Sequence, residues 1–399
     1  MSVIQRGTPA RRTRGELMGV WTALSLVDVE SIGAGGGSVG WIDARGMLRV
    51  GPGSAGAVPG PACYARGGHD ATVTDALVVL GYIDPDRFLG GTMALDADAA
   101  RAACARLGEP LALDAEETAW GMRELALAGM VKAVRSRLVD RGLDPREHSL
   151  VSYGGSGSLF TPDIAAAIGV PRVLVPELAS VLSAFGAATT DIRRERLRSV
   201  LAAMPVDTRL IDKLMDELRS EIHDDLAEEG VGPTDRRIEF EAHLRFSRQV
   251  WEIQVPLPDE KVDAAVLDQL LEAFRGEYAK RYGQGSIVLG APIELVSLGA
   301  IGHGRTVQAR LDAGHHEPVP AGTLAASAGA IGTRAVRLAR GPAGDGVRDV
   351  PVLDGGALRP GHVLWGPALV DGSDTTVWIP EGLSAQVDPY GTLILELAP

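Results

Sequence analysis

Glycine is concentrated in a few stretches of this chain, and that pattern constrains the fold more than any other feature. The 399 residues include 50 glycines, about one in eight, whereas ordinary usage is about 7%. The densest stretches are SIGAGGGSVG at 31–40, GPGSAGAVPGPACYARGG at 51–68 and GGSG at 154–157. Clustered glycine without a repeat period indicates tight turns and loops where the backbone approaches another group closely.

Composition and charge exclude several classes of protein. Hydrophobic residues make up 45% of the chain and charged residues 23%, which is typical of a globular protein with a substantial core. The formal net charge of −13 repels phosphates, so nucleic acid is not an expected partner. No apolar run reaches the length of about 18 residues that a membrane span needs, and the basic N-terminus lacks the apolar region of a secretory signal. We therefore expect a cytoplasmic protein in which Cys63 and Cys104 are reduced thiols.

Hydrophobic periodicity predicts alternating helices and strands. A hairpin is expected over 41–50, around the turn at 43–46. A strand at 149–153, a glycine turn, a helix at 159–168 and a strand at 172–176 form an α/β unit. Further helices are expected at 72–81, 96–107, 115–141, 211–230 and 266–282, and further strands at 240–246, 250–257 and 293–302.

These elements predict an α/β protein in three parts. Residues 1–203 form the first α/β region, residues 204–314 a mixed α/β region, and residues 315–399 a β-rich region of short strands between Gly and Pro turns. The run Arg193, Arg194 and Arg196 near the first boundary is interpreted as the solvated face of a helix or as a subunit contact.

The glycine loops exclude two common nucleotide motifs. Gly35, Gly37 and Gly40 fit G-x-G-x-x-G, but a hairpin follows where a dinucleotide fingerprint needs a helix. No G-x-x-x-x-G-K-[ST] phosphate loop occurs in the sequence. The loop of Gly154, Gly155, Ser156 and Gly157 does lie between a strand and a helix. Its backbone N–H groups can receive an anion or a flat ligand, or the loop can be a tight turn without a ligand.

Several blocks of sequence resemble the hydantoinase A/oxoprolinase family. The longest is SIGAGGGSVGWIDARGMLRVGPGSAGAVPGPACYARGG followed by TVTDALVVLGYIDPDRFLGG. RGLDPREHSLVSYGGSGSLF and RVLVPELASVLSAFGA extend the resemblance, and GPALVDGSDTTVWIPEGLSAQVDPYGTLILEL is similar to the family's C-terminal end. The similarity runs from about residue 27 to residue 399.

This resemblance implies half of an actin/hexokinase/Hsp70-like ATPase fold, with ATP and Mg²⁺ as cofactors. It implies that Gly154, Gly155, Ser156 and Gly157 form the loop near the adenosine. It further implies that the stretch 33–38, with Gly35, Gly36, Gly37 and Ser38, lies near the phosphates or the substrate.

The sequence also departs from the family pattern. The family's Asp-x-Gly-Gly-Thr phosphate loop and its Gly-Gly-Thr-Ser-Thr-Asp-like loop are both absent from this chain. The Gly-Pro-Leu-His that follows the adenosine loop in the family reads Gly157-Ser158-Leu159-Phe160 here, so the family histidine is missing. The chain therefore resembles the C-terminal half of a hydantoinase A protein, with the phosphate loops supplied by a separate subunit or lost.

Asp75 is the candidate catalytic carboxylate, as a partner of a Mg²⁺-bound water or of the substrate. Its alternative role is to cap the helix that begins beside it. His69, which precedes Asp75 in a loop, is interpreted as a solvated loop residue. His315, His316 and Glu317 are interpreted as surface residues, because adjacent strand residues point apart and do not converge on a metal. No protein metal ligands are predicted. Asp371, Asp374 and Asp388 are interpreted as turn residues.

The resemblance implies three candidate functions. The first is a subunit of an ATP-dependent cyclic-amide hydrolase that phosphorylates a carbonyl oxygen. The second is a subunit of an ATP-dependent ketone carboxylase, and the third is a non-catalytic scaffold derived from the family. The implied partners are an N-terminal-half subunit that carries the phosphate loops, a hydantoinase B-like subunit, and a cyclic amide or ketone substrate.

Overall fold

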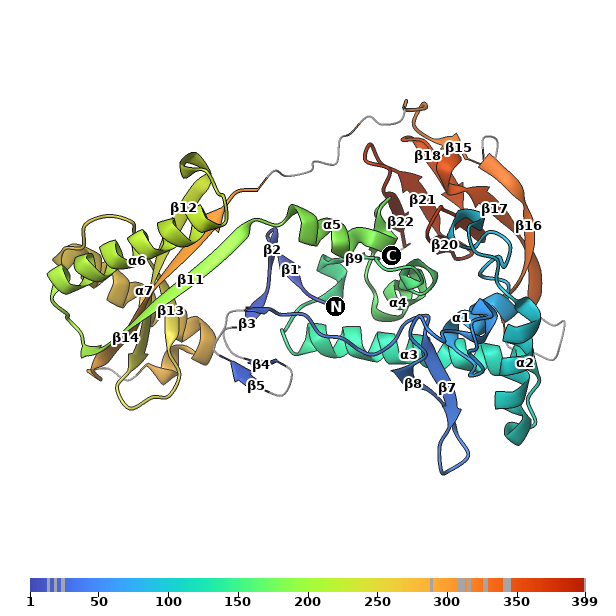
Figure 1. Cartoon of the computed structure of the whole chain (residues 1–399), viewed down its shortest axis with the longest axis horizontal. Coiled ribbons are helices and arrows are strands. Elements are labelled where there is room, and N and C mark those ends of the chain that lie inside the picture. The colour runs from blue at the N-terminus through green and yellow to red at the C-terminus, as the bar shows by residue number, and fades with distance from the viewer. Residues whose placement is uncertain are drawn as a thin grey trace. The chain divides into compact units, whose positions relative to one another are not determined.

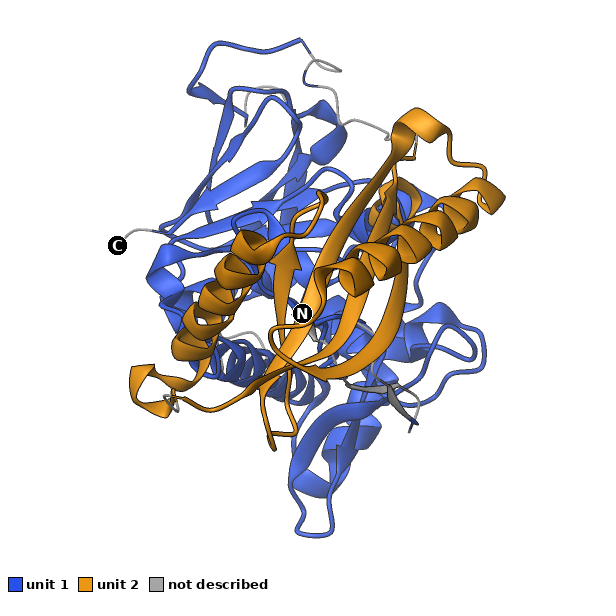
Figure 2. Ribbon diagram, turned by 90° about the vertical axis from the view of Figure 1, so that its left-hand side faces the viewer, with its two compact units in different colours: residues 1–185, 311–399 blue, residues 186–310 orange. Residues whose placement is uncertain are grey.

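The computed structural model describes residues 1–397 except 13–14, 18–19, 23–25, 288–289, 307–312, 314–316, 326–328 and 340–345. Its contacts divide the chain into two compact units (Figure 2). Unit 1 consists of residues 1–185 and 311–399, and unit 2 consists of residues 186–310. The boundaries of these units differ from the domain boundaries at 203 and 314 that we expected from the sequence. The three expected domains remain a prediction.

Unit 1 contains helices α1 to α4 (Figure 1). They are α1 (Val73–Val79), α2 (Ala97–Gly108), α3 (Ala115–Val139) and α4 (Thr161–Ile168). Capping boxes start α1 and α3, where Thr72 pairs with Asp75 and Asp114 pairs with Glu117. α4 ends at Gly169, whose φ of 82° suits a residue without a Cβ. The helices expected at 72–81, 96–107, 115–141 and 159–168 are confirmed within a few residues.

Unit 1 has two larger sheets, of which the six-stranded one draws on segments that are distant in sequence. The six-stranded sheet has the order β15 (Thr323–Leu324), β18 (His362–Trp365), β21 (Ser384–Val387), β22 (Leu393–Glu396), β10 (Arg172–Val175), β9 (Ser149–Val151). The four-stranded sheet has the order β16 (Ala330–Arg337), β17 (Val347–Asp354), β19 (Ala368–Asp371), β20 (Thr376–Ile379). In the first sheet, β22 pairs antiparallel with β10 and so joins the C-terminal segment to the N-terminal one.

Four two-stranded ribbons complete the strands of unit 1. The hairpin of β7 (Ser38–Ile42) and β8 (Leu48–Ser54) confirms the hairpin expected over 41–50. The other ribbons pair β1 (Ile4–Gln5) with β2 (Thr8–Pro9), β3 (Arg11–Arg12) with β6 (Leu26–Val27), and β4 (Gly15–Leu17) with β5 (Val20–Thr22).

The core of unit 1 also unites its two segments. One cluster joins side chains of α1, α2 and α3 to Val336 and Trp378 from the C-terminal segment. Within it, the rings of Tyr82 and Trp378 meet edge to face, with their centroids 5.4 Å apart. The apolar area shared by residues this far apart in sequence explains why 1–185 and 311–399 form one unit.

Unit 2 is an antiparallel sheet with helices packed against it. The strand order is β11 (Ile192–Ala203), β14 (Ile293–Gly304), β12 (Arg236–Phe246), β13 (Ile253–Leu257). The contacts of α6 (Thr208–Glu228) are with β11, β12 and β14, and those of α7 (Ala264–Tyr282) are with β13. Helix α5 (Leu182–Thr189) spans the boundary between the units.

The helix proposed around the arginine run is wrong. Arg193, Arg194 and Arg196 lie in strand β11, which pairs along its length with β14. The sequence IRRERLRS alternates, and its even-numbered arginines pair with acidic residues in and just after α6: Arg196 with Asp225 in the helix, and Arg194 with its C-cap residue Glu229. Because the pairing strand is about 100 residues away in sequence, local pattern alone favoured a helix.

Among the described residues, no helix combines the length and apolar character needed to cross a membrane. Cys63 and Cys104 are both buried, free thiols. Burial raises the pKa of Cys63, and the nearby Asp75 carboxylate raises it further. Burial also raises the pKa of Cys104 to about 12. Neither thiol therefore has the thiolate character of a nucleophile at neutral pH.

Candidate functional site

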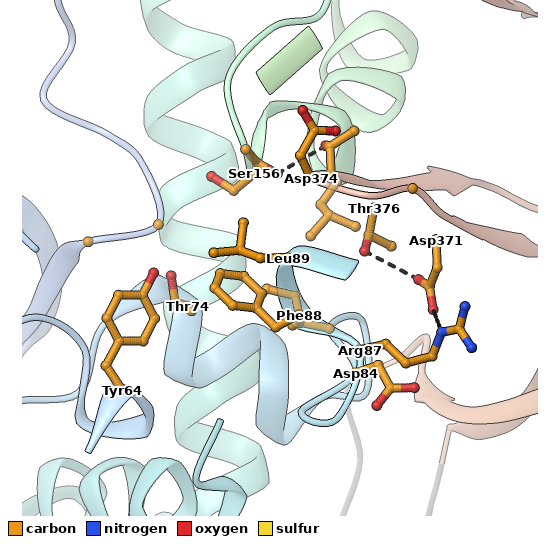
Figure 3. A pocket seen from close by; sticks show the side chains of 17 residues that line it. Tyr64, Thr74, Asp84, Arg87, Phe88, Leu89, Ser156, Asp371, Asp374 and Thr376 are labelled. Atoms are coloured by element: carbon orange, nitrogen blue, oxygen red, sulfur yellow. Dashed lines mark hydrogen bonds and ion pairs between the residues drawn. The ribbon is translucent and has the colours of Figure 1, made fainter. Parts of the chain in front are cut away.

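A cavity of about 260 Å³ lies in unit 1, where the two sequence-predicted glycine loops meet (Figure 3). Gly36 and Gly37 line it from the first loop, and Gly155 and Ser156 line it from the second. The structure thus brings together two loops that are about 120 residues apart in sequence. The remaining lining residues are Tyr64, Thr74, Ile83, Asp84, Arg87, Phe88, Leu89, Leu159, Asp371, Gly372, Asp374, Thr375 and Thr376.

The first glycine loop, 33–38, is closed by its own hydrogen bonds and by α1. The Gly35 N–H donates to Oγ of Ser38 at 3.0 Å, and the Ser38 N–H donates to the Gly35 carbonyl at 3.0 Å. The Thr74 N–H of α1 donates to the Gly36 carbonyl at 2.8 Å. A Cβ on Gly36 would lie 2.6 Å from Oγ1 of Thr74, so this position needs glycine for close packing. Gly35 and Ser38 shape the loop without lining the cavity.

The second glycine loop, 154–157, connects β9 to α4, as expected. Gly154 has a φ of 90°, and its N–H donates to the Ala179 carbonyl at 2.8 Å. A Cβ built on Gly154 or Gly155 meets nothing within 4 Å. The backbone at Gly155 therefore faces open space on a wall of the cavity, where a flat or anionic group can approach it. Gly157 closes the turn with a bond from its N–H to the Gly154 carbonyl at 3.2 Å.

A third loop, 372–375 between β19 and β20, also lines the cavity, and the sequence analysis did not assign it to the site. Oγ1 of Thr375 donates to the Gly155 carbonyl at 3.1 Å, and Oγ of Ser158 donates to the Thr376 carbonyl at 2.9 Å. Ser180 donates to the Asp374 carboxylate. The polar run DGSDTT between two buried strands was the available signal, because polar loops held by a rigid scaffold are common binding elements.

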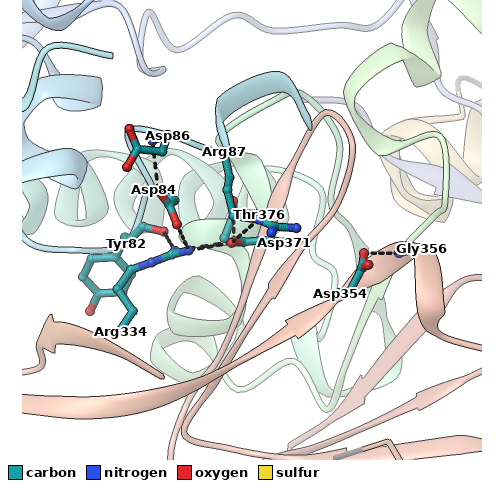
Figure 4. Close-up of polar contacts among 9 residues, drawn as sticks. All are labelled: Tyr82, Asp84, Asp86, Arg87, Arg334, Asp354, Gly356, Asp371 and Thr376. Atoms are coloured by element: carbon teal, nitrogen blue, oxygen red, sulfur yellow. Dashed lines mark hydrogen bonds and ion pairs between the residues drawn. The ribbon is translucent and has the colours of Figure 1, made fainter. Parts of the chain in front are cut away.

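The interpretation of Asp371 as a turn residue is wrong. It is the last residue of strand β19, and its side chain is 6% exposed. Its carboxylate contacts Nη2 of Arg334 at 2.5 Å and accepts a hydrogen bond from Oγ1 of Thr376 at 3.3 Å (Figure 4). Nη2 of Arg334 also lies 2.8 Å from the Asp84 carboxylate. A buried carboxylate requires such a partner, so this bridge fixes two walls of the cavity.

Asp388, in contrast, is a turn residue. Its carboxylate accepts hydrogen bonds from the N–H groups of Tyr390 and Thr392, both at 2.8 Å. His69 and Glu317 are exposed, as expected for surface residues. His315 and His316 lie outside the described residues.

Phe160, at the position of the missing family histidine, is fully buried, and its ring centroid lies 5.7 Å from Cζ of the Arg123 guanidinium.

The candidate catalytic residue Asp75 is buried beneath the cavity and does not line it. Its carboxylate accepts four hydrogen bonds: from the N–H groups of Ala62 (3.2 Å), Cys63 (2.7 Å) and Thr72 (2.8 Å), and from Oγ1 of Thr72 (2.8 Å). These bonds tie the loop at 60–64 to the start of α1. The geometry favours the capping role that we weighed against catalysis, and contact of Asp75 with a Mg²⁺-bound water remains a prediction.

Part of the cavity lining is apolar and aromatic. The rings of Tyr64 and Phe88 lie 5.9 Å apart and tilted, and Leu89 lies beside them (Figure 3). Burial raises the pKa of Tyr64, so its hydroxyl remains a hydrogen-bond donor at neutral pH. The cavity therefore combines an apolar surface with hydroxyl, carboxylate and guanidinium groups, a combination typical of small-molecule sites.

Among the described residues, no cluster of three or more His, Cys, Asp or Glu side chains has the arrangement of a metal site. Asp84 and Asp371 both line the cavity, but the Arg334 bridge occupies them.

Comparison with known proteins assigns the chain to a family. Residues 1–196 match the family described as Hydantoinase/oxoprolinase, and residues 204–397 match the Hydantoinase/oxoprolinase C-terminal domain. The chain belongs to the hydantoinase/oxoprolinase family. The family resemblance carried by the glycine-rich blocks is thereby confirmed.

The relatives include enzymes of different activities. The caprolactamase subunit alpha of Pseudomonas jessenii is 34% identical over 380 residues, which are 94% of this chain and 53% of that protein. The acetophenone carboxylase gamma subunit of Aromatoleum aromaticum is 29% identical over 385 residues, 94% of this chain and 51% of that protein. The chain thus spans about half the length of the curated relatives it matches.

Solved structures show the same fold. The nucleotide-free structure of acetone carboxylase, from a study of ATP-dependent acetone carboxylation, superposes with a TM-score of 0.85 at 26% identity. It covers 99% of this chain and 56% of that chain. The predicted α/β fold of the ATPase type is confirmed.

Proposed function

We propose that this chain is one part of an ATP-dependent enzyme that activates the carbonyl oxygen of a cyclic amide by phosphorylation. The observation that carries the proposal is the meeting of the loops 33–38 and 154–157 at one polar cavity. The family adds support, because its members of known structure include the ATP-dependent enzymes acetone carboxylase and caprolactamase. The choice of a cyclic amide rests on the caprolactamase subunit, the relative with 34% identity, whose name describes a lactam substrate.

In this proposal, the two glycine loops divide the ligand between them. The loop of Gly154, Gly155, Ser156 and Gly157 contacts the adenosine, where the open backbone at Gly155 allows a flat group to approach. The loop with Gly35, Gly36, Gly37 and Ser38 lies near the phosphates or the substrate. Thr74 and Ser156 also line the cavity, and their hydroxyls supply donors to oxygen atoms of the ligand.

The residues present fit part of a nucleotide. The cavity of about 260 Å³ is near the lower end of the range of about 300–1,000 Å³ usual for ligand sites. We propose a shared site, in which a partner that carries the phosphate loops completes the enclosure. ATP, when bound, supplies the phosphoryl group, and we propose that Mg²⁺ arrives coordinated to its phosphates, as in other phosphoryl-transfer sites.

We accordingly propose two protein partners, an N-terminal-half hydantoinase A-like subunit and a hydantoinase B-like subunit. The relatives support this arrangement, because the caprolactamase and acetophenone carboxylase matches are named subunits.

A ketone carboxylase subunit is the second candidate function. The TM-score of 0.85 to acetone carboxylase favours it, as does the match to an acetophenone carboxylase subunit. The two functions differ in whether bicarbonate is consumed, so product analysis with a lactam and with a ketone distinguishes them. A scaffold without activity is the third candidate, and the absence of nucleotide binding would support it.

The decisive experiment measures ATP hydrolysis and nucleotide binding by the chain alone and mixed with the N-terminal-half partner. We expect activity only in the mixture, and Gly155→Trp should reduce it by about 100-fold because the ring displaces the ligand. A side chain at this position has room at its first carbon, since a Cβ on Gly155 meets nothing within 4 Å.

Gly129→Trp is the matched control, because Gly129 is an exposed residue of α3 with equally open surroundings. Turnover by the chain alone would contradict the shared site. A mixture that neither binds nor hydrolyses ATP would contradict the proposed function and favour the scaffold.

A further inference from the structure

Arg87 is a cationic side chain on the cavity wall that the proposed function does not yet use. It lies just before the short helix η2 (Phe88–Gly91), and 49% of its side chain is exposed. Among the described residues that line the cavity, it is the one Lys or Arg. Within the described part of the chain, its ion pair is with Asp371, at 4.0 Å between Nε and Oδ2, the outer limit of such a contact (Figure 3).

Asp371 does not need Arg87 as its counter-ion. Arg334 already contacts the Asp371 carboxylate through Nη2 at 2.5 Å and Nη1 at 3.5 Å, and Thr376 adds a hydroxyl donor (Figure 4). The Arg334 side chain is 14% exposed, which makes this the closer and better shielded pair. The guanidinium of Arg87 therefore keeps donors available for another group.

The backbone holds Arg87 at the cavity. The residues that follow it, Leu89 and Gly90, have φ angles of 50° and 64°, so the chain turns sharply there. A Cβ on Gly90 would lie 3.3 Å from the Ser373 carbonyl oxygen, so this turn packs directly on the loop at 372–375. The turn and that loop therefore form one wall, and Arg87 extends from it.

The charge around Arg87 permits an anion to bind. Asp84 and Asp371 carry two negative charges, and Arg334 and Arg87 carry two positive charges, so the cluster of four is neutral. Asp374 adds a further carboxylate to the cavity lining and accepts a hydrogen bond from Ser180. Binding of an anion therefore depends on direct contact with the guanidinium of Arg87. A planar guanidinium with free donors matches the oxygen atoms of a phosphate or a carboxylate.

We infer that Arg87 is a ligand-binding residue that recognises an anionic oxygen group, a phosphate or a carboxylate, on the molecule in this cavity. The inference rests on the proposed function and adds the chemical class of one ligand group. A phosphate would come from the nucleotide, and a carboxylate would come from a cyclic amide that carries one.

The test measures binding by calorimetry to the chain mixed with its N-terminal-half partner. The probes are Mg·ADP, inorganic phosphate, 5-oxoproline (a lactam with a carboxylate) and 2-pyrrolidone (the same ring without it). Arg87→Ala should lower the binding affinity for the anionic probe by about 10- to 100-fold, because a charge-assisted contact is lost. Arg87→Lys should retain part of the affinity, and 2-pyrrolidone should bind equally to all variants.

Arg348→Ala is the matched control, since Arg348 is an exposed arginine of β17 paired with Glu381 outside the cavity. If Arg87→Ala loses affinity only for Mg·ADP and phosphate, the anionic group belongs to the nucleotide. If it loses affinity only for 5-oxoproline, the anionic group belongs to the substrate. Unchanged affinity of Arg87→Ala for every probe that the wild type binds would overturn the inference alone. A wild-type mixture that binds no probe would overturn the proposed function with it.

Discussion

At the scale of single residues, Asp75 separates a structural role from a catalytic one. Its buried carboxylate accepts four hydrogen bonds that join the loop at 60–64 to α1. Asp75→Asn places an amide NH₂ among these donors, and we expect it to lower the free energy of unfolding by about 3 kcal/mol. Thermal or urea denaturation measures the change.

The control for this prediction is Asp98→Asn, at an exposed position in the first turn of α2, with an expected change within about 0.5 kcal/mol. If Asp75→Asn retained wild-type stability while losing ATP hydrolysis in the mixture, the capping role would be wrong and the catalytic prediction would be supported.

The sequence identified some site residues and missed others for a physical reason. The glycine loops were recognisable for two reasons. Glycine is needed wherever backbone packs closely, and the stretches of sequence that contain the loops resemble the family over a long run. Asp371 and Asp388 both occur in polar stretches of sequence that are typical of turns, and nothing local in the sequence distinguishes them. Asp371 differs from Asp388 in its ion pair with Arg334, a residue 37 positions earlier in the sequence. Arg334 in turn contacts Asp84, which is 250 residues away from it in sequence. Such tertiary pairing is invisible to local pattern.

At the scale of elements, caps and periodicity located the helices well, but the strand β11 was missed because its partner β14 is distant. The packing of α6 on β14 gives a prediction. A Cβ on Gly302 of β14 would lie 2.3 Å from Cγ2 of Ile222 on α6. Gly302→Ala should therefore destabilise unit 2 by about 1–3 kcal/mol through overpacking, as measured by chemical denaturation.

Gly276→Ala provides the opposite case in the same unit. Gly276 lies inside α7 and a Cβ there meets nothing within 4 Å, so the change should stabilise by about 0.5–1 kcal/mol. Equal effects of the two substitutions would mean that α6 does not pack on β14 as described.

At the scale of the whole molecule, the two units have separate cores. Among the described residues, the buried apolar residues of the unit 2 core fall within 206–300, whereas the unit 1 cores join 62–179 to 325–395. Val336→Ala, at a fully buried position, should destabilise unit 1 by about 2 kcal/mol. Hydrogen exchange should then accelerate in α1, α2 and α3 but not in unit 2, because stability is partitioned between cooperative regions. Acceleration across both units would instead indicate one cooperative molecule.

The division into units was beyond the reach of the sequence. Composition changes near residue 203 and again near 315, and these changes suggested three consecutive parts. That the last segment returns to the first depends on strand pairs such as β10 with β22, which no local signal reports.

The pairing of β10 with β22 has a consequence for synthesis on the ribosome. Residues 172–175 are translated about 220 residues before their antiparallel neighbours at 393–396. Unit 2, a continuous segment, can fold while β10 still lacks that neighbour. During this interval an apolar strand edge of unit 1 is open, and such edges pair readily with other chains. The nascent chain is therefore most vulnerable to aggregation between the completion of unit 2 and the arrival of β22.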